Sequence, residues 1–279
     1  MKKRIIPLSV IVLLAALVVP TAAAQFTPEE LGQRVFWETF LKTATIVRTE
    51  TVGEGVTRPT KVYLKQMDTE GKAIWKNVRE ELSDGALDDW RFEIAAYRID
   101  KLIGLGLIPP VVERELEGRP GALSLFVKSQ YSLLKVMDEN IPIPPETADR
   151  TNKLKYLTRA FDCLIANDDR TQQNILYTED WRTLLIDHSR AFRSDRPHVE
   201  RLIYGRNGFK TIDGKPMLFR QLPRTFVQAV RGLEAPDIKA AVGSYLTDDE
   251  IAAIMGRKKL LLAEIEDLIK EKGEKAVLY

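Results

Sequence analysis

The chain has 279 residues, with 42 lysines and arginines against 40 aspartates and glutamates and a formal net charge of +2. So balanced a charge argues against a nucleic-acid-binding domain, which would carry a strongly basic surface. The single cysteine, Cys163, excludes an internal disulfide, and with only two histidines a zinc site is not expected. Because Cys163 stands in a largely apolar stretch, we expect a buried, unreactive thiol.

Residues 1–24 have the layout of a secretory signal peptide. Met1–Arg4 is basic, Ile5–Val19 is almost continuously apolar, and Ala22–Ala24 offers small residues for cleavage. The apolar run is short for a membrane-spanning helix, which needs about 20 residues, so we expect cleavage after Ala24; an uncleaved anchor is the alternative. In both cases the rest of the chain is expected to be exported, periplasmic or secreted, and to contact the membrane only through this segment if it is retained.

Residues 25–127 predict an N-terminal helix followed by a lobe rich in β-structure. Thr27, Pro28 and Glu30 form a capping box at the start of the helix. Stretches rich in β-branched and aromatic residues, separated by turn sequences, then predict an antiparallel meander over 44–52, 57–67 and 73–78. The remaining elements expected in this lobe are a helix over 88–105 and short strands over 111–116 and 122–127.

Residues 128–279 predict a mainly helical lobe. A connector begins at Lys128 and contains the proline-rich run 141–145, which we expect to be irregular. A helix over 152–165 leads into a polar loop, and two short strands and further helices follow. The whole pattern favours an α+β chain of two lobes, with a β-rich small lobe ahead of a mainly helical large lobe.

Three oxygen-bearing side chains are the first candidates for chemistry: Asp169, Asn174 and Asp187. Metal-assisted phosphoryl transfer needs hard oxygen ligands for Mg²⁺ and an acidic group at the attacking hydroxyl. Asp169 and Asn174 have the spacing of the catalytic aspartate and the metal-binding asparagine of a kinase catalytic loop. The two strands after Asn174 would return Asp187 to the same place. Taken alone, the loop sequence is also compatible with an ordinary turn.

The small lobe adds further candidates. Lys76 stands in a predicted strand, where kinase folds hold the nucleotide phosphates, and Glu93 on the following helix could pair with it. Gly53 and Gly55 form a glycine turn ahead of Lys76, which would let backbone N–H groups approach phosphates. An exposed strand lysine and a plain hairpin turn remain the alternatives for these residues.

Four stretches carry a family resemblance: Trp90–Tyr97, Leu105–Pro110, Phe161–Arg170 and Leu185–Phe192. They resemble bacterial atypical kinases, which are related to phosphatidylinositol 3-/4-kinases, HipA-like kinases and the secretory-pathway (Golgi casein kinase) family. The resemblance implies a kinase fold with ATP and Mg²⁺ (or Mn²⁺) between the lobes. It assigns phosphate binding to Lys76, its support to Glu93, catalysis to Asp169, metal binding to Asn174 and Asp187, and, loosely, the glycine loop to Gly53 and Gly55.

Some residues depart from the kinase pattern. Thr171 stands where many of these relatives have a histidine, and His188-Ser189 replaces the Phe-Gly that follows the metal aspartate of ordinary protein kinases. We count Arg170 with Asp169 among the candidate catalytic residues, in either a loop-steadying or a charge-offsetting role. The loops 141–150 and 195–215 are expected to choose the acceptor.

We therefore expect an exported kinase that transfers the γ-phosphoryl group of ATP to a hydroxyl of an unidentified protein, sugar or lipid. No nucleic-acid partner is expected. Two alternatives stay open. One is a pseudokinase-like nucleotide-binding or interaction module without turnover. The other is adenylyl transfer on the same scaffold.

Overall fold

The computed structural model describes residues 26–52 and 59–279. The predicted signal peptide and the turn with Gly53 and Gly55 lie outside these ranges. Within them, no helix is long and apolar enough to cross a membrane. The helix expected after Thr27 is confirmed, since this residue and Glu30 form a reciprocal capping box at the start of α1 (Pro28–Gly32).

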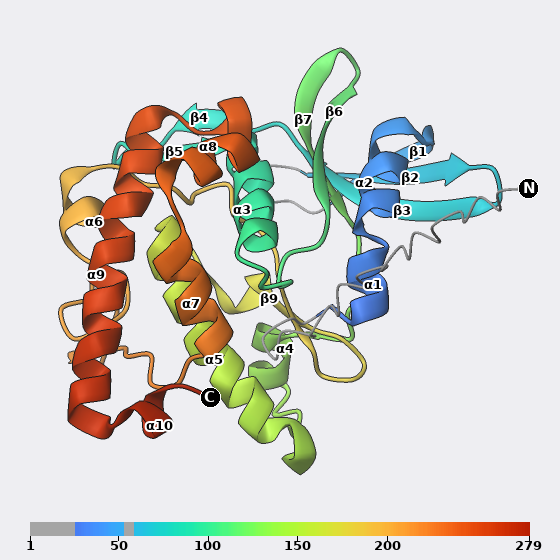
Figure 1. Cartoon of the computed structure of the whole chain (residues 1–279). Helices are drawn as coiled ribbons and strands as arrows, with labels where there is room; N and C mark the ends of the chain where they lie inside the picture. The colour runs from blue at the N-terminus through green and yellow to red at the C-terminus, as the bar shows by residue number, and fades with distance from the viewer. Residues whose placement is uncertain (1–25, 53–58) are drawn as a thin grey trace, which may run out of the picture.

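The small lobe is built on a five-stranded antiparallel sheet with the strand order β1-β2-β3-β7-β6 (Figure 1). The predicted meander is confirmed, because the first three strands are neighbours in sequence order. Strand β7 begins at Arg119, earlier than the predicted start at 122, because Glu117 and Gly118 alone, both at positive φ, make the turn. The strands are β1 (Thr45–Thr51), β2 (Thr60–Gln66), β3 (Thr69–Lys76), β6 (Val111–Leu116) and β7 (Arg119–Leu125).

The alternation of side chains along β3 places neighbouring residues on opposite faces of the sheet. Trp75 is buried in a cluster with Phe40 of helix α2 (Arg34–Thr43), which covers one face. Lys76 therefore points to the other face, toward helix α3 (Trp90–Leu102). Trp75 thus packs in the core of the small lobe, and Lys76, the next residue, faces the space between the lobes.

A short hairpin of β4 (Arg79–Glu81) and β5 (Leu87–Asp89) separates β3 from α3. This hairpin was not predicted, and α3 begins two residues later than the predicted helix. Asp89 is the N-cap of α3, because its side chain accepts a hydrogen bond from the backbone N–H two residues on. The backbone N–H of Asp89 also donates to the carbonyl of Ser189 at 2.8 Å, so the hairpin is bonded to the large lobe.

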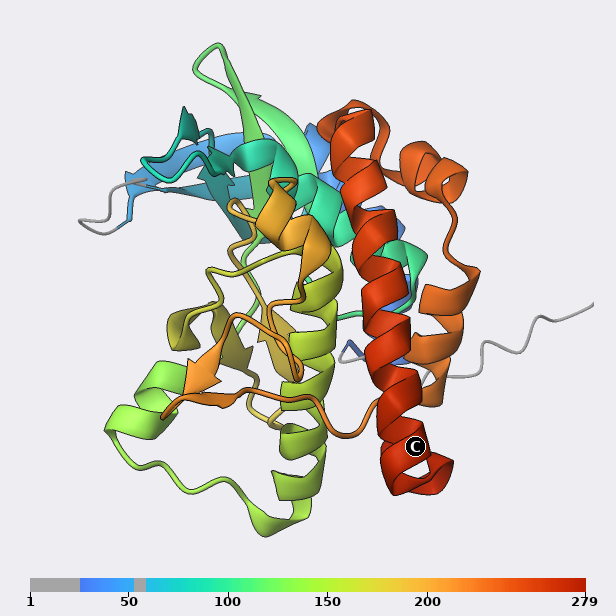
Figure 2. The same ribbon diagram turned by 90° about the vertical axis from the view of Figure 1, so that its left-hand side faces the viewer.

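The large lobe is mainly helical, with α5 and the long α9 side by side (Figure 2). Helix α5 begins at Pro145, earlier than the predicted start at 152, with the proline at the first helical position where its missing N–H costs nothing. The connector that begins at Lys128 contains two short elements, β8 and α4, and the run 141–144 is irregular as expected. The elements are β8 (Tyr131–Ser132), α4 (Leu133–Asp138), α5 (Pro145–Ile165), the 3-10 helix η1 (Gln172–Asn174), β9 (Ile175–Tyr177), β10 (Thr183–Leu185), α6 (Arg196–Glu200), β11 (Thr211–Ile212), β12 (Lys215–Pro216), α7 (Arg224–Gly232), α8 (Ala235–Val242), η2 (Gly243–Tyr245), α9 (Asp248–Lys272) and α10 (Glu274–Val277).

The close approach of β7 to β3 generates a stability prediction. A Cβ atom added to Gly121 would lie 2.5 Å from the carbonyl oxygen of Lys76 and 2.6 Å from the indole nitrogen of Trp75. Gly121→Ala should therefore lower the free energy of unfolding by about 1–3 kcal/mol. Gly32→Ala is the matched control, because nothing lies within 4 Å of a Cβ there. Denaturant unfolding of both variants checks this, and an unchanged stability of Gly121→Ala would contradict the packing described.

Candidate functional site

The structure brings Lys76, Glu93 and Asp187 together. The Nζ atom of Lys76 lies 2.7 Å from Oε1 of Glu93 and 2.7 Å from Oδ1 of Asp187. The three side chains come from β3, α3 and the segment that follows β10, so residues far apart in the sequence meet at one point. The side chain of Asp187 is 42% exposed and that of Glu93 only 4%. Asp187 is thus the carboxylate of the pair that a ligand can reach.

The electrostatics hold Lys76 and Glu93 in their charged forms. Burial disfavours the lysine cation, but the carboxylates of Glu93 and Asp187 outweigh burial and raise the pKa of Lys76. Burial would also raise the pKa of Glu93, but the charge of Lys76 and the hydrogen bond from His188 outweigh burial and lower it. At neutral pH the site therefore contains a fixed ammonium group with one buried partner and one accessible partner.

The β9–β10 hairpin places Asn174 beside Asp187. Leu185 pairs with Ile175 in the hairpin, and the N–H of Ile186 donates to the carbonyl of Asn174 at 3.1 Å. Asp187 follows with φ of 62°, a left-handed conformation that aspartate tolerates better than most residues. The two predicted metal ligands therefore leave adjacent ends of one hairpin.

Asp169 lies in the loop after α5, and an arginine that the sequence analysis did not consider faces it. Nη1 of Arg190 is 3.4 Å from Oδ2 of Asp169, while its Nε donates to Asp88 of β5 at 2.9 Å. Burial raises the pKa of Asp169, the nearby aspartates raise it further, and Arg190 opposes them. A raised pKa suits a group that accepts a proton near neutral pH. The only sequence signal for Arg190 was its place in the fourth family-like stretch.

Arg170 does not face the Lys76 cleft. Its side chain is 2% exposed and binds the carboxylate of Asp162, with Nη2 to Oδ1 at 2.9 Å and Nε to Oδ2 at 3.2 Å. Its Nη1 donates to the carbonyl of Ile186 at 2.7 Å. Of the two roles expected for it, the geometry fits loop-steadying, because Arg170 ties α5 to the residue before Asp187. The sequence analysis missed Asp162, which looked like one more polar residue on a helix.

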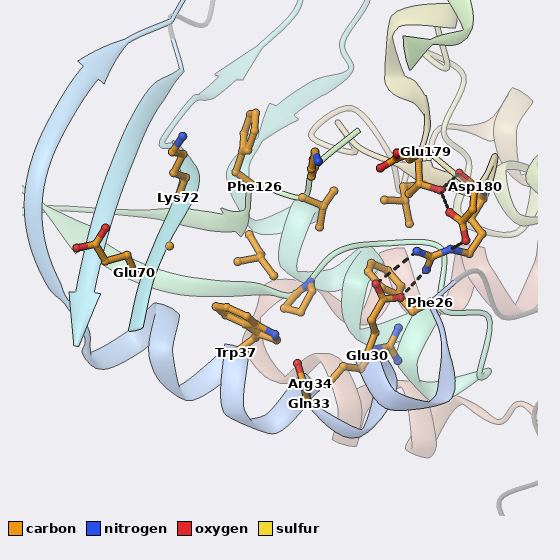
Figure 3. A pocket seen from close by; sticks show the side chains of 18 residues that line it. Phe26, Glu30, Gln33, Arg34, Trp37, Glu70, Lys72, Phe126, Glu179 and Asp180 are labelled. Atoms are coloured by element: carbon orange, nitrogen blue, oxygen red, sulfur yellow. Dashed lines mark hydrogen bonds and ion pairs between the residues drawn. The ribbon is translucent and has the colours of Figure 1, made fainter. Parts of the chain in front are cut away.

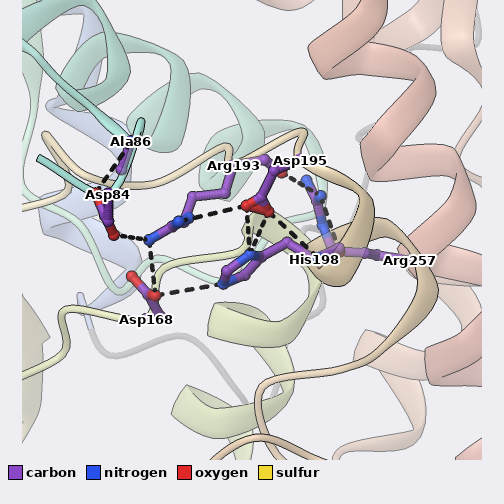
Figure 4. A network of polar contacts seen from close by, with 7 residues as sticks. All are labelled: Asp84, Ala86, Asp168, Arg193, Asp195, His198 and Arg257. Carbon is purple, nitrogen blue, oxygen red and sulfur yellow. Dashed lines mark hydrogen bonds and ion pairs between the residues drawn. The ribbon is translucent and has the colours of Figure 1, made fainter. Parts of the chain in front are cut away.

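A second polar network supports the loop from the other side (Figure 4). Nη1 of Arg193 lies 2.8 Å from Asp84, in the β4–β5 hairpin, and 3.3 Å from Asp168, in the loop after α5. His198 lies between Asp168 and Asp195 and contacts both carboxylates. Arg193 thus connects the small lobe to the residue before the candidate proton acceptor. None of these contacts was predicted.

A cavity of about 300 Å³ opens beside the Lys76 trio. Its polar end contains Lys76, Glu93 and Asp187. Its remaining walls are largely apolar and come from β3, the β6–β7 pair, the segment that joins the lobes, and the β9–β10 hairpin; they include Ile74, Ile108, Val111, Leu125, Leu176 and Leu185. A mostly apolar slot with a few convergent polar groups at one end is typical of a small-molecule site and suits a flat base attached to phosphates.

A larger cavity, about 700 Å³, lies elsewhere, between α1, α2 and the segment joining the lobes (Figure 3). Phe26, Trp37, Phe126 and the Glu30–Arg182 ion pair line it. None of the predicted site residues that the structure describes belongs to its walls, so volume alone does not identify the site.

The donor set at Asn174 and Asp187 fits Mg²⁺ or Mn²⁺. Among the described residues no group of three or more histidine, cysteine, aspartate or glutamate side chains could hold a metal by itself. A nucleotide-dependent site does not need one, since a carboxylate and an amide oxygen share the ion with phosphate oxygens and water. The accessible carboxylate of Asp187 is such a hard oxygen donor.

No protein-family model matches the sequence, and no curated protein is significantly similar to it. Solved structures do match. A structure of hydra Fam20 with sugar shares 14% identity and a TM-score of 0.57, over 92% of this chain and 95% of that one. The Helicobacter pylori proinflammatory kinase CtkA shares 10% identity and a TM-score of 0.53, over 84% of this chain and 97% of that one. At these identities the likeness shows the fold alone: the expected α+β, two-lobed, kinase-like fold is confirmed.

Proposed function

We propose that the chain is an exported kinase that transfers the γ-phosphoryl group of ATP to a hydroxyl of a protein, sugar or lipid acceptor. The observation that carries the proposal is the pairing of Lys76 with both Glu93 and Asp187 at the polar end of an apolar slot. The kinase-like fold of the matching structures supports the reaction class. The signal-peptide layout of residues 1–24 supports export to the periplasm or the medium.

In this mechanism Lys76, fixed by Glu93, binds and orients the phosphates of the nucleotide. Asn174 and Asp187 would supply oxygen ligands for Mg²⁺ or Mn²⁺, and such an ion would contribute neutralisation of the phosphate charge. Catalysis of this type depends on positioning and on preorganised charge rather than on covalent intermediates. The buried Lys76–Glu93 pair is suited to it, because the ammonium group needs no reorganisation when phosphates arrive.

Asp169 takes the proton of the acceptor hydroxyl. As that proton moves to Asp169, the acceptor oxygen forms its bond to the γ-phosphorus, and the bond from phosphorus to the bridging oxygen of ADP breaks. Arg190, which contacts Asp169 and is bound by Asp88, keeps the carboxylate oriented and favours its charged form. Arg170 holds the loop and the segment before Asp187 in register.

Asp187→Asn tests the proposal directly. The amide loses the charge that holds both the metal and Lys76, so Mg²⁺-ATP turnover should fall by about 10²-fold or more while the fold survives. Asp68→Asn, in the exposed turn between β2 and β3 where asparagine is well tolerated, is the matched control and should keep full activity. Unchanged turnover in Asp187→Asn would refute the metal-binding assignment.

The products distinguish the proposed transfer from adenylylation. With ATP labelled separately on the γ-phosphate and on adenine, mass analysis of the acceptor should find only the phosphoryl group. Transfer of AMP would keep the nucleotide site and overturn the reaction. The absence of any product, together with nucleotide binding, would favour the pseudokinase alternative.

The acid limb of the pH–activity profile should report Asp169. A base must be deprotonated to act, so activity falls as pH drops through its pKa. Because burial and neighbouring aspartates raise the pKa of Asp169 above its usual 3.8, the loss should begin at a higher pH than for an ordinary aspartate. Arg190→Gln removes an opposing cation and should move the limb of kcat/KM further upward. Arg231→Gln, on the exposed face of α7, is the control. A downward or absent shift in Arg190→Gln would contradict the assignment.

A further inference from the structure

A separate cavity of about 510 Å³ lies in the large lobe. It shares no lining residue with the slot at Lys76. Its volume falls in the range of roughly 300–1,000 Å³ that is typical of small-molecule sites. One wall is formed by Arg170, Thr171 and Gln172, which belong to the loop between Asp169 and Asn174. The cavity is therefore adjacent to the catalytic loop but distinct from the proposed nucleotide site.

The packing of the surrounding elements explains why this space stays open. Helix α4 packs on η1 and β9, whereas α5 packs on α9. Between α4 and α5 the chain runs through the linker 139–144, which has prolines at 142 and 144. The apolar residues near α4 form a small cluster of their own, around Val136, Tyr177 and Trp181, apart from the main core. The cavity is the space left between these two clusters.

The apolar part of its lining comes from both sides. Its members are Leu133 and Met137 of α4, Ile143 of the linker, Ile175 and Tyr177 of β9, and Met217 after β12. Two of these are methionines, whose unbranched side chains adapt to ligands of different shape. This part of the wall can hold an apolar body but offers it little directional bonding.

The polar part of the lining carries an excess of positive charge. Thr151, Lys155 and Arg159 follow one another at four-residue spacing along α5, so they share one helix face, and all three line the cavity. The one carboxylate in the lining, Asp162, is already bound by Arg170. Within residues 26–52 and 59–279 no carboxylate forms an ion pair with Lys155 or Arg159.

The other contacts of these two cations are weak competitors for an anion. Lys155 lies over the ring of Tyr156, 4.8 Å from its centre. Arg159 donates through Nη1 to the carbonyl of Leu218, and its guanidinium group lies near the rings of Tyr156 and Tyr204, 5.9 and 5.5 Å from their centres. Two cations one helical turn apart, beside an apolar wall, match an anionic group attached to an apolar body.

We propose that this cavity binds a small amphiphile with one anionic head group, such as a phosphate ester. The head group lies between Lys155 and Arg159, and the apolar body lies among the side chains of α4, the linker and β9. Because Thr171 and Gln172 contribute to the wall, the bound molecule contacts the loop that carries Asp169. The site is defined without reference to the nucleotide, so its test does not depend on kinase activity.

Isothermal titration calorimetry with three probes tests the proposal. Octyl phosphate, below its aggregation concentration, should bind at a single saturable site. Octyl glucoside has the apolar body without the charge, and inorganic phosphate has the charge without the body; both should bind at least tenfold more weakly. Equal binding of inorganic phosphate would overturn the apolar part of the site, and non-saturating binding of octyl phosphate would overturn the site itself.

Variants locate the binding in this cavity. Lys155→Met should weaken octyl phosphate binding roughly tenfold, as expected for the loss of a charge-assisted contact. Met217→Trp should abolish it by filling the cavity, with a thermal melt to confirm folding. Lys153→Met is the matched control, since Lys153 is on the same helix but does not line the cavity. Equal weakening in Lys153→Met, or displacement of octyl phosphate by ATP, would overturn the assignment.

Discussion

The ammonium group of Lys76, held between the carboxylates of Glu93 and Asp187, is the interaction on which the rest of the site depends. A buried charge is tolerated only when it is paired, and removing one partner leaves the other uncompensated at a cost of about 3–5 kcal/mol. The pairing therefore constrains the sheet, helix α3 and the β9–β10 hairpin to one arrangement. The same geometry that satisfies the buried charges presents one carboxylate to the space between the lobes.

The remaining polar contacts can be understood as support for that arrangement. Arg170 binds Asp162 of α5 and donates to the carbonyl of Ile186, so it fixes the segment before Asp187. Arg190 and Arg193 reach from the large lobe to aspartates of the β4–β5 hairpin. The β4–β5 hairpin therefore connects the two lobes. The loop that carries Asp169 is held by Arg170 on one side and by Arg193 on the other. Proton transfer and phosphate positioning need this kind of preorganisation.

Local signals in the sequence were sufficient for part of this picture. The predicted capping box at Thr27 begins a helix, because the contacts of a cap lie within a few residues. The placement of Lys76, Glu93 and Asp187 in one cleft was also expected, because the resemblance to atypical kinases assigns all three to one nucleotide site. The two-lobed fold followed from the order of those elements.

Long-range contacts between charged residues were not predictable in the same way. Asp88 and Arg190 are 102 residues apart, and in the sequence each resembles an ordinary surface charge. Arg170 was expected at the reacting centre because it follows Asp169 in the sequence. In the fold the two side chains point to different partners, Arg170 to Asp162 and Asp169 to Arg190. The β4–β5 hairpin was missed because its strands are three residues each and carry mostly charged side chains.

The most direct measurement for the central claim is thermal unfolding in the presence of ATP, with and without Mg²⁺. A ligand that binds the folded state stabilises it by RT ln(1 + [L]/Kd), about 2.7 kcal/mol at a hundredfold excess over Kd. The account predicts stabilisation of the wild-type protein by Mg²⁺-ATP, a smaller effect without the metal, and little effect in Lys76→Met. A melting temperature that does not respond to Mg²⁺-ATP in the wild type would contradict the claim that the Lys76 cleft is a nucleotide site.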